Sequence, residues 1–145
     1  MSLSVTIVTQ ERTVLERDDV ERLIVPTIEG QITVLPKHAA LMASLASGEM
    51  TVVALGDEAP FAVHGGFIHV VDDRVTVLAD AAEHVDEINE ARAEAARERA
   101  EQLIAGPTAG AETVDLLRAQ LSVRRALLRL RVKRRRAGTG APSAR

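Results

Sequence analysis

The residues best suited to chemistry in this chain are the arginines of one segment, "RRALLRLRVKRRR" (Arg124–Arg136). A guanidinium group stays charged and can bind a carboxylate or a phosphate through two parallel hydrogen bonds. A cluster of arginines therefore predicts an anion-binding surface. Leu127, Leu128 and Leu130 lie among the arginines, which is more apolar area than a merely solvated basic face needs. We therefore expect the segment to contact an acidic partner.

The charge of the remaining chain limits what that partner can be. Residues 1–115 carry 21 acidic and 8 basic residues, a net charge of −13, whereas residues 116–145 carry ten basic residues and no acidic one. Such an acidic body repels a phosphate backbone, and the chain has no Trp or Tyr to stack on bases. Protein carboxylates are the favoured ligand. A free-standing nucleic-acid-binding module with a basic tail is the alternative function.

Other residue types that support catalysis or metal binding form no pattern in this chain. The nearest pair of histidines, His64 and His69, is five residues apart, which is not a metal-ligand spacing. Gly65-Gly66 lacks the spacing of a phosphate-binding loop. The absence of Cys rules out thiolate chemistry and disulfides, and fits a reducing cytoplasm. We expect no catalytic residue and no metal site, so the chain is not an enzyme by itself.

Up to about residue 84 the chain has the pattern of β-structure. Asp72-Asp73, between two apolar runs, predicts a two-residue hairpin loop. Short strands at this spacing are typical of an all-β sandwich or barrel. The predicted strands are Ser4–Gln10, Glu21–Ile28, Gln31–Pro36, Met50–Leu55, Phe61–Gly65, Phe67–Val71 and Arg74–Ala79.

The second part of the chain has the pattern of two helices. "DEINEARAEAARERAEQLIAGP" is rich in strong helix formers, with Asp86 as the expected N-cap and Gly106-Pro107 as the expected stop. Helical periodicity resumes over Thr113–Arg136. A short connection predicts an antiparallel hairpin, whose internal core is weak because the first helix offers mainly alanines. The predicted domains are residues 1–84 (β), 85–136 (hairpin) and 137–145 (a flexible tail). We expect no signal peptide and no membrane span.

An ordered set of short motifs extends over both predicted domains. It resembles the epsilon subunits of bacterial rotary (F-type) ATP synthases over roughly residues 3–133. The motifs are Glu29-Gly30, Leu35-Pro36-Lys37-His38, Gly48, Gly65-Gly66 and Val77-Leu78-Ala79-Asp80, followed by a helix that begins near Ile88.

This resemblance implies a flattened β-sandwich of about ten short strands, followed by an antiparallel two-helix hairpin. It implies a non-catalytic rotor subunit of the central stalk, which couples proton flow to ATP synthesis and inhibits ATP hydrolysis through its C-terminal helices. The implied partners are the gamma subunit, bound through an apolar sandwich face, the membrane ring of c subunits, and a catalytic beta subunit. The implied location is peripheral, on the cytoplasmic face of the cell inner membrane, with no nucleic-acid partner.

The resemblance also assigns residues to two contact surfaces. Epsilon subunits usually have Gly where this chain has Lys37, which adds a charge to a loop expected near the c-ring. The expected c-ring residues are Glu29, Gly30, Gln31, Leu35, Lys37 and His38. The expected inhibitory contacts to beta and gamma are Arg118, Arg124, Arg125, Leu128, Arg129 and Arg131.

A nucleotide site is the last feature that the resemblance raises. Family members that bind regulatory ATP have Asp where this chain has Asn89, and Asn keeps the carbonyl acceptor but loses the charge. We therefore expect weak or absent ATP binding and no other cofactor. The remaining positions that match the nucleotide pattern are Glu83, Ile88, Arg92, Arg99, Arg125 and Arg129.

Overall fold

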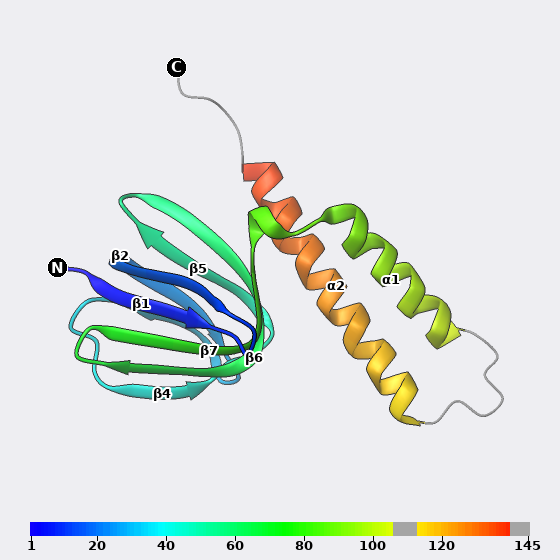
Figure 1. Ribbon diagram of the computed structural model, residues 1–145, viewed down its shortest axis with the longest axis horizontal. Helices are drawn as coiled ribbons and strands as arrows, with labels where there is room; N and C mark the ends of the chain where they lie inside the picture. Colours follow the sequence, from blue (N-terminus) through cyan, green and yellow to red (C-terminus); the bar gives the residue numbers. More distant parts are fainter. Residues whose placement is uncertain (106–112, 140–145) are drawn as a thin grey trace, which may run out of the picture. The chain divides into compact units, whose positions relative to one another are not determined.

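A computed structural model describes residues 1–105 and 113–139, which divide into two compact units, residues 1–85 and residue 86 onward (Figure 1). The first unit contains seven strands: β1 (Leu3–Val8), β2 (Thr13–Thr27), β3 (Gly30–Val34), β4 (Leu41–Ser44), β5 (Gly48–Ala54), β6 (Asp57–Val71) and β7 (Arg74–His84). A 3-10 turn at Val85–Glu87 precedes α1 (Glu90–Ala105) and α2 (Thr113–Thr139).

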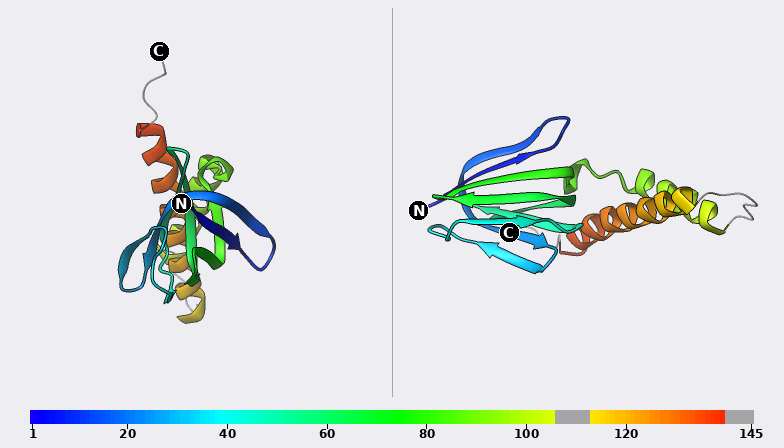
Figure 2. Two further views of the ribbon diagram at one scale, coloured as in Figure 1. Left: turned by 90° about the vertical axis from the view of Figure 1, so that its left-hand side faces the viewer. Right: turned by 90° about the horizontal axis from the view of Figure 1, so that it is seen from below.

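The strands of the first unit form the predicted sandwich. Their order is β1-β7-β6-β5-β2-β3, with β4 paired to β6 and β1 also paired to β2. All these pairings are antiparallel except that of β1 with β7. The long strand β6 contributes to two layers (Figure 2), because residues 57–63 pair with β5 whereas residues 67–70 pair with β4.

Two long strands replace several of the short strands expected from the sequence. Strand β2 begins at Thr13, well before the predicted start at Glu21. Its first half is charged but is held in the sheet by pairing with β1. Phe61–Gly65 and Phe67–Val71 are parts of the single strand β6, which bends at Gly65 (φ 69°) and Gly66 (φ 110°). A Cβ at Gly66 would overlap the Leu78 carbonyl oxygen on β7. This close approach of the two strands requires glycine.

The predicted hairpin loop at Asp72-Asp73 is confirmed. Both residues have positive φ, 46° and 61°, as the tight turn between β6 and β7 requires. Outside glycine, this conformation is best tolerated by Asn and Asp.

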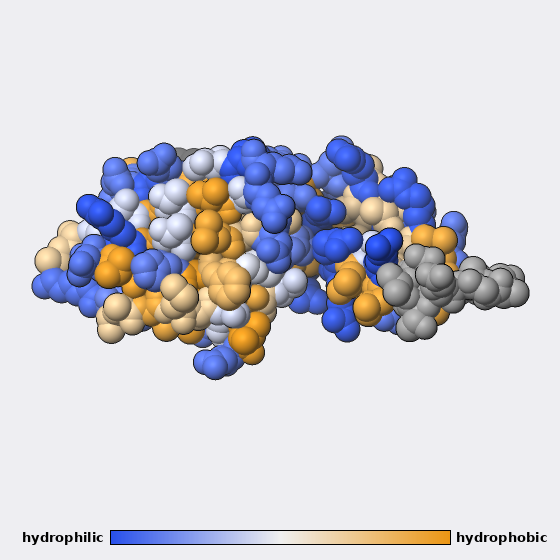
Figure 3. Space-filling view, turned by 60° about the horizontal axis from the view of Figure 1, so that its bottom comes forward, coloured by the Kyte–Doolittle hydropathy of each residue, from blue (hydrophilic) through white to orange (hydrophobic). Residues whose placement is uncertain are grey.

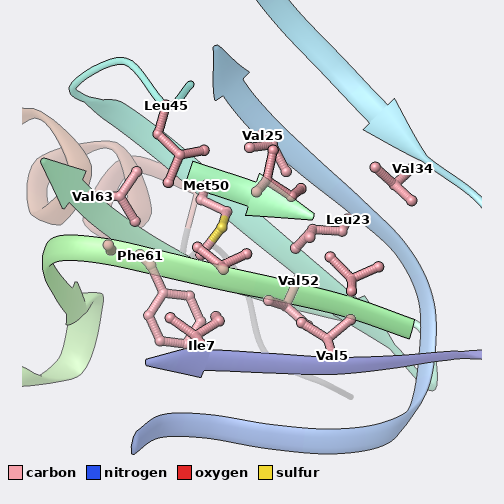
Figure 4. Packing of buried hydrophobic residues seen from close by; sticks show 14 of the residues in the cluster. Val5, Ile7, Leu23, Val25, Val34, Leu45, Met50, Val52, Phe61 and Val63 are labelled. Atoms are coloured by element: carbon pink, nitrogen blue, oxygen red, sulfur yellow. The ribbon is translucent and has the colours of Figure 1, made fainter. Parts of the chain in front are cut away.

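The sandwich core is aliphatic, as the near absence of aromatic residues predicts. Alternate residues of β1, which are Leu3, Val5 and Ile7, are fully buried, and every strand except β4 contributes to the same cluster (Figure 4). Phe61 is its largest side chain and makes an edge-to-face contact with His84, with ring centroids 4.9 Å apart. Burying side chains of this size stabilises a fold by about 1.5–3 kcal/mol each.

The first helix begins at a different cap from the one expected. The Oδ1 atom of Asn89 accepts a hydrogen bond from the Arg92 N–H at 3.0 Å, and the Asn89 carbonyl accepts one from the Ala93 N–H at 3.0 Å. Asn89 is therefore the N-cap, and the prediction of Asp86 is wrong, because Asp86 lies in the 3-10 turn.

The two helices form the predicted hairpin. Their seam is built from small residues: Ala93 and Ala100 of α1 are buried, as are Ala119 and Ala126 of α2, with Leu130 continuing the α2 stripe. Helix α2 extends to Thr139, three residues beyond the expected end of the hairpin. Gly106-Pro107 and residues 140–145, the rest of the expected tail, lie outside the described residues.

Candidate interaction surfaces

The turn between β2 and β3 presents the first group of predicted contact residues. Thr27 Oγ1 donates a hydrogen bond to the Gly30 carbonyl at 2.6 Å, and the Ile28 N–H donates one to the Ser44 carbonyl of β4 at 3.1 Å. These bonds fix the backbone of the turn, so that Glu29 and its neighbours are exposed on a rigid support.

The loop that follows β3 presents the second group. The Lys37 N–H donates to Asp73 Oδ1 at 2.5 Å, and the His38 N–H donates to the Leu35 carbonyl at 3.1 Å. His38 Nδ1 also lies 2.7 Å from the Ala39 carbonyl oxygen, so its tautomer with a proton on Nδ1 can donate there. Lys37 has a φ of 66°, in the left-handed region that glycine adopts at lower cost. This backbone fits the glycine that the resemblance leads one to expect at this position.

The structure does not bring these two groups together. Gly30 begins β3 and Val34 ends it, so the Glu29 turn and the Leu35–His38 loop lie at opposite ends of one strand. Five extended residues separate the two ends by about 16 Å. The residues expected to contact the c-ring therefore form two groups, one at each end of β3.

An exposed apolar patch lies on the sandwich beside the Glu29 turn. Phe67 of β6 pairs directly with Leu78 of β7, and Met42 of β4 pairs with His69, two residues from Phe67, so all three apolar side chains share one outer face. The exposed fractions are 70% for Ile28 and Met42, 56% for Phe67 and 54% for Leu78. We call these four residues the outer apolar face.

A shallow cavity of about 360 Å³ adjoins this face. Apolar side chains gather among polar ones on the side of the sandwich that carries β4 (Figure 3). A patch of this kind on the surface of a folded domain marks an interaction site. The cavity is lined by Thr27, Ile28, Glu29, Leu41, Met42, Ala43, Ser44 and Phe67.

The predicted inhibitory residues lie along α2, away from its seam with α1. The helical period places Leu121 and Leu128 about 180° from the stripe of Ala126 and Leu130 that faces α1. Two rows of arginine flank these leucines, Arg124 and Arg131 on one side and Arg118, Arg125 and Arg129 on the other.

Accessibility differs along this surface. All of these arginines are exposed except Arg129, which is half-buried. Leu128 is only 8% exposed. A partner can therefore reach the guanidinium groups directly, whereas little of the Leu128 side chain is accessible.

The residues of the nucleotide pattern are spread over three elements. Glu83 lies near the end of β7 in the first unit, and Ile88 and Asn89 directly precede α1. Arg92 and Arg99 share one face of α1 because they are seven residues apart, and Arg125 and Arg129 share one face of α2 because they are four apart. The Asn89 side chain caps the helix, so a nucleotide would compete with that hydrogen bond.

A group of charges between the helices was not foreseen. Arg134 of α2 binds two carboxylates of α1, with its Nε 2.8 Å from Glu90 Oε1 and a terminal nitrogen 3.3 Å from Glu94 Oε2. The hydrogen bond to Glu90, followed by the charges of both carboxylates, raises the pKa of Arg134 above its usual value. The sequence does contain a signal for these ion pairs. Glu90 and Glu94 have i,i+4 spacing, and an antiparallel hairpin places them opposite the basic end of the second helix.

The structure offers no group of three or more His, Asp or Glu that could hold a metal ion within residues 1–105 and 113–139. Neither helix in this part of the chain is both long and apolar enough to cross a membrane.

Family models match both units of the chain. Residues 2–85 match the model described as "ATP synthase, Delta/Epsilon chain, beta-sandwich domain", and residues 86–134 match "ATP synthase, Delta/Epsilon chain, long alpha-helix domain".

Two similar proteins align with this chain over most of its length. The ATP synthase epsilon chain of Herpetosiphon aurantiacus is 43% identical over 136 residues, covering 94% of this chain and 97% of that one. The epsilon chain of Chloroflexus aggregans is 45% identical over 132 residues, covering 91% and 92%.

Solved structures show the same fold at low sequence identity. A chain in the mitochondrial ATP synthase of Euglena gracilis has a TM-score of 0.65 at 21% identity, covering 95% of this chain and 81% of that chain. A chain in the central stalk and c-ring of the Tetrahymena thermophila enzyme has a TM-score of 0.57 at 18% identity, covering 93% and 96%.

Proposed function

Because the chain belongs to the delta/epsilon chain family of ATP synthases, we propose that it is a rotor subunit of the central stalk, coupling proton flow to ATP synthesis and restraining ATP hydrolysis through its C-terminal helices. The observation that carries this proposal is the match of both family domains in order, over residues 2–134. The subunit itself is non-catalytic. Its place is peripheral, at the cytoplasmic face of the membrane that holds the enzyme.

The outer apolar face is the proposed contact with the gamma subunit. Ile28, Met42, Phe67 and Leu78 leave more than half of their side-chain area in water, and burying such a patch favours association. Replacing Met42 and Phe67 by Ser should therefore abolish co-purification with co-expressed gamma. Replacing Leu103, which is exposed on α1, should leave co-purification intact. Equal recovery of gamma with both variants would exclude the outer apolar face as the contact.

The two ends of β3 are the proposed contacts with polar loops of the c-ring. The Glu29 turn adjoins the outer apolar face, whereas the Lys37 loop lies at the far end of β3. Substituting Lys37→Glu tests the second contact, and an exposed ion pair predicts a loss of only ~0–1 kcal/mol. If proton pumping and c-ring binding stay unchanged across a salt series, Lys37 does not belong to that interface.

The exposed arginines of α2 are the proposed brake on ATP hydrolysis. Arg118, Arg124, Arg125 and Arg131 are exposed on α2 and can form charge-assisted pairs with beta-subunit carboxylates, each worth roughly 1.5–3 kcal/mol. The leucines between them, Leu128 included, would pack along gamma once uncovered. Such contacts could be broken by rotation in the synthesis direction, which would give one-way inhibition.

The test of the brake is removal of the helix from the assembled enzyme. Deleting residues 107–145 should raise the rate of ATP hydrolysis and leave assembly and ATP synthesis largely unchanged. Changing Arg124, Arg125, Arg129 and Arg131 to Gln should give most of that increase, whereas trimming residues 140–145 alone, the matched control, should give little. A truncated enzyme that hydrolyses ATP no faster, over a range of ADP and proton-motive force, would show that α2 is not a brake.

Regulation by nucleotide is proposed to be weak in this subunit. Asn89 lacks the charge of Asp, and its side-chain oxygen is already occupied by the Arg92 N–H. Titration calorimetry of the isolated subunit with ATP should therefore show no micromolar binding. A micromolar dissociation constant would refute this, and Glu83, Arg92, Arg99, Arg125 and Arg129 would then be the residues to mutate.

A further inference from the structure

Arg134 joins the two helices of the hairpin by two ion pairs. It reaches Glu90 and Glu94, which lie one turn apart at the start of α1, from near the end of α2. These residues lie at the end of the hairpin farthest in sequence from the connection, residues 106–112. At the connected end the chain itself keeps the helices together, so separation of the helices must begin at the Arg134 end.

The two carboxylates are held in place before Arg134 meets them. Glu94 also pairs through its second oxygen with Arg97, one turn further along α1, and Arg97 lies within 3.8 Å of Glu101. Glu90 directly follows the Asn89 cap, so it occupies the first turn of α1, where the helix dipole favours a carboxylate. Arg134 thus binds a preorganised pair and orders few additional groups.

The rest of the seam contributes little apolar area. Alanines occupy most of its fully buried positions, which are Ala93, Ala100, Ala119 and Ala126; Leu130 is the buried large side chain, and Leu116 and Val123 on the same stripe are only half-buried. Apolar stabilisation scales with the area removed from water. Charged contacts therefore contribute a larger share of the free energy that stabilises the closed hairpin than they would between helices with a leucine seam.

We propose that Arg134, with Glu90 and Glu94, is the latch that keeps α1 and α2 closed against each other, and that breaking it raises the population of separated helices. The regulatory consequence rests on the proposed function, since separation frees α2 to reach the catalytic head. The latch is partly exposed, with half of the Arg134 and Glu90 side chains in solvent. Its strength should therefore fall as salt rises.

The experiment measures the distance between the helices in the full-length chain. The chain has no Cys, so cysteines placed at Ala95 and Leu127, both exposed, carry spin labels without a background. Arg134→Glu should lower the ratio of closed to open hairpin by about fivefold or more, as expected from two partly exposed pairs turned repulsive. Adding Glu90→Arg should restore part of the closed population.

The matched control is Glu98→Gln, which removes an exposed charge of α1 that lies away from the stripe of Ala93 and Ala100. It should leave the distance distribution unchanged. If Arg134→Glu gives the same distribution as the parent chain at low salt, or if Glu98→Gln opens the hairpin equally, the latch is refuted.

A second measurement separates the latch from the proposed function. ATP hydrolysis by the assembled enzyme should be slower with Arg134→Glu, because more of the hairpin is free to extend. If the distances lengthen but hydrolysis does not change, the latch stands and the proposed brake fails. If the distances do not change, the latch fails whatever the hydrolysis rate.

Discussion

Each of the two units of this chain is stabilised internally by a different kind of interaction. Eighteen buried side chains, nearly all of them Val, Leu, Ile, Met or Phe, form one cluster in the sandwich. The hairpin has a seam in which most of the fully buried residues are alanines, and Arg134 pairs with two carboxylates at the end away from the connection. The sandwich is therefore fixed by apolar area, which salt scarcely changes, whereas the hairpin depends on charges that salt screens.

This difference matches the roles proposed for the two units. A scaffold that contacts a partner continuously needs a single shape, which a close-packed core provides. An arm that changes position needs a closed state only slightly more stable than its alternatives. Substitutions in each unit test this contrast.

Removal of the largest core side chain should show the dependence of the sandwich on area. Phe61→Ala should lower the free energy of unfolding of the sandwich by about 3–5 kcal/mol, through lost burial and the cavity left behind. Leu103→Ala, at a 62% exposed position of α1, is the control and should change stability by less than about 0.5 kcal/mol. Urea unfolding followed by circular dichroism measures both, and equal effects would contradict the contrast.

Loss of the helix cap should affect only the hairpin. Asn89→Ala removes the acceptor for the Arg92 N–H and should destabilise α1 by about 1 kcal/mol. Asn89→Asp should keep the cap, because Asp caps a helix as well as Asn does. Amide hydrogen exchange should report faster exchange in α1 for the Ala variant alone. Faster exchange in the sandwich strands as well would mean that the units are not energetically separate.

Relief of backbone strain should stabilise the sandwich slightly. Lys37→Gly removes the left-handed strain at φ 66°, partly offset by the greater freedom of glycine in the unfolded chain, for a net gain of about 0.5 kcal/mol. Lys37→Ala keeps the strain and controls for loss of the side chain. Thermal unfolding should place the midpoint of the Gly variant above that of the Ala variant, and the reverse order would show that Lys37 is not strained.

The smallest effect concerns a surface pair of the sandwich. Arg17 binds Asp19 through two hydrogen bonds of 2.7 and 2.6 Å, and the bond from Arg17 is the main cause that lowers the pKa of the Asp19 carboxyl. A lowered pKa in the folded state stabilises the fold above the pKa of the unfolded chain, about 3.9, and this contribution is lost as the pH falls through the folded value. The stability difference between the parent and Asp19→Asn should therefore vanish in acid. A difference that persists would exclude the pair as its source.

The sequence predicted those features that depend on local signals. Alternating Val and Ile predicted the sandwich, and Asp72-Asp73 predicted a tight turn because few other pairs tolerate two positive φ angles. The charged first half of β2 was missed because it is stabilised by pairing with β1, a contact between residues far apart in sequence. The cap was placed at Asp86 because Asp and Asn are equally good caps. Only the 3-10 turn before α1 decides between them.

The candidate surfaces were predicted less completely than the fold. The motif Leu35–His38 and the Glu29 turn are close in sequence, and only the direction of β3 shows that they lie at opposite ends of a strand. Arg134 was read with the other arginines as a ligand for a partner, but pairing across the hairpin commits it to Glu90 and Glu94. Contacts across elements, which no local pattern encodes, account for both differences.

The position of the two loops at opposite ends of β3 has a mechanical consequence. When a subunit turns together with its support, the contacts between them must transmit a torque. For a given torque, the force on each contact falls as the distance between the contacts grows. If both loops bind the c-ring as proposed, attachments about 16 Å apart, the length of five extended residues, would each carry less force than two attachments side by side. The hydrogen bonds between β2 and β3 run across this span, so the load would be shared along a sheet instead of being concentrated in a loop. In the proposed rotor, β3 would thus set the distance between the two contacts with the c-ring.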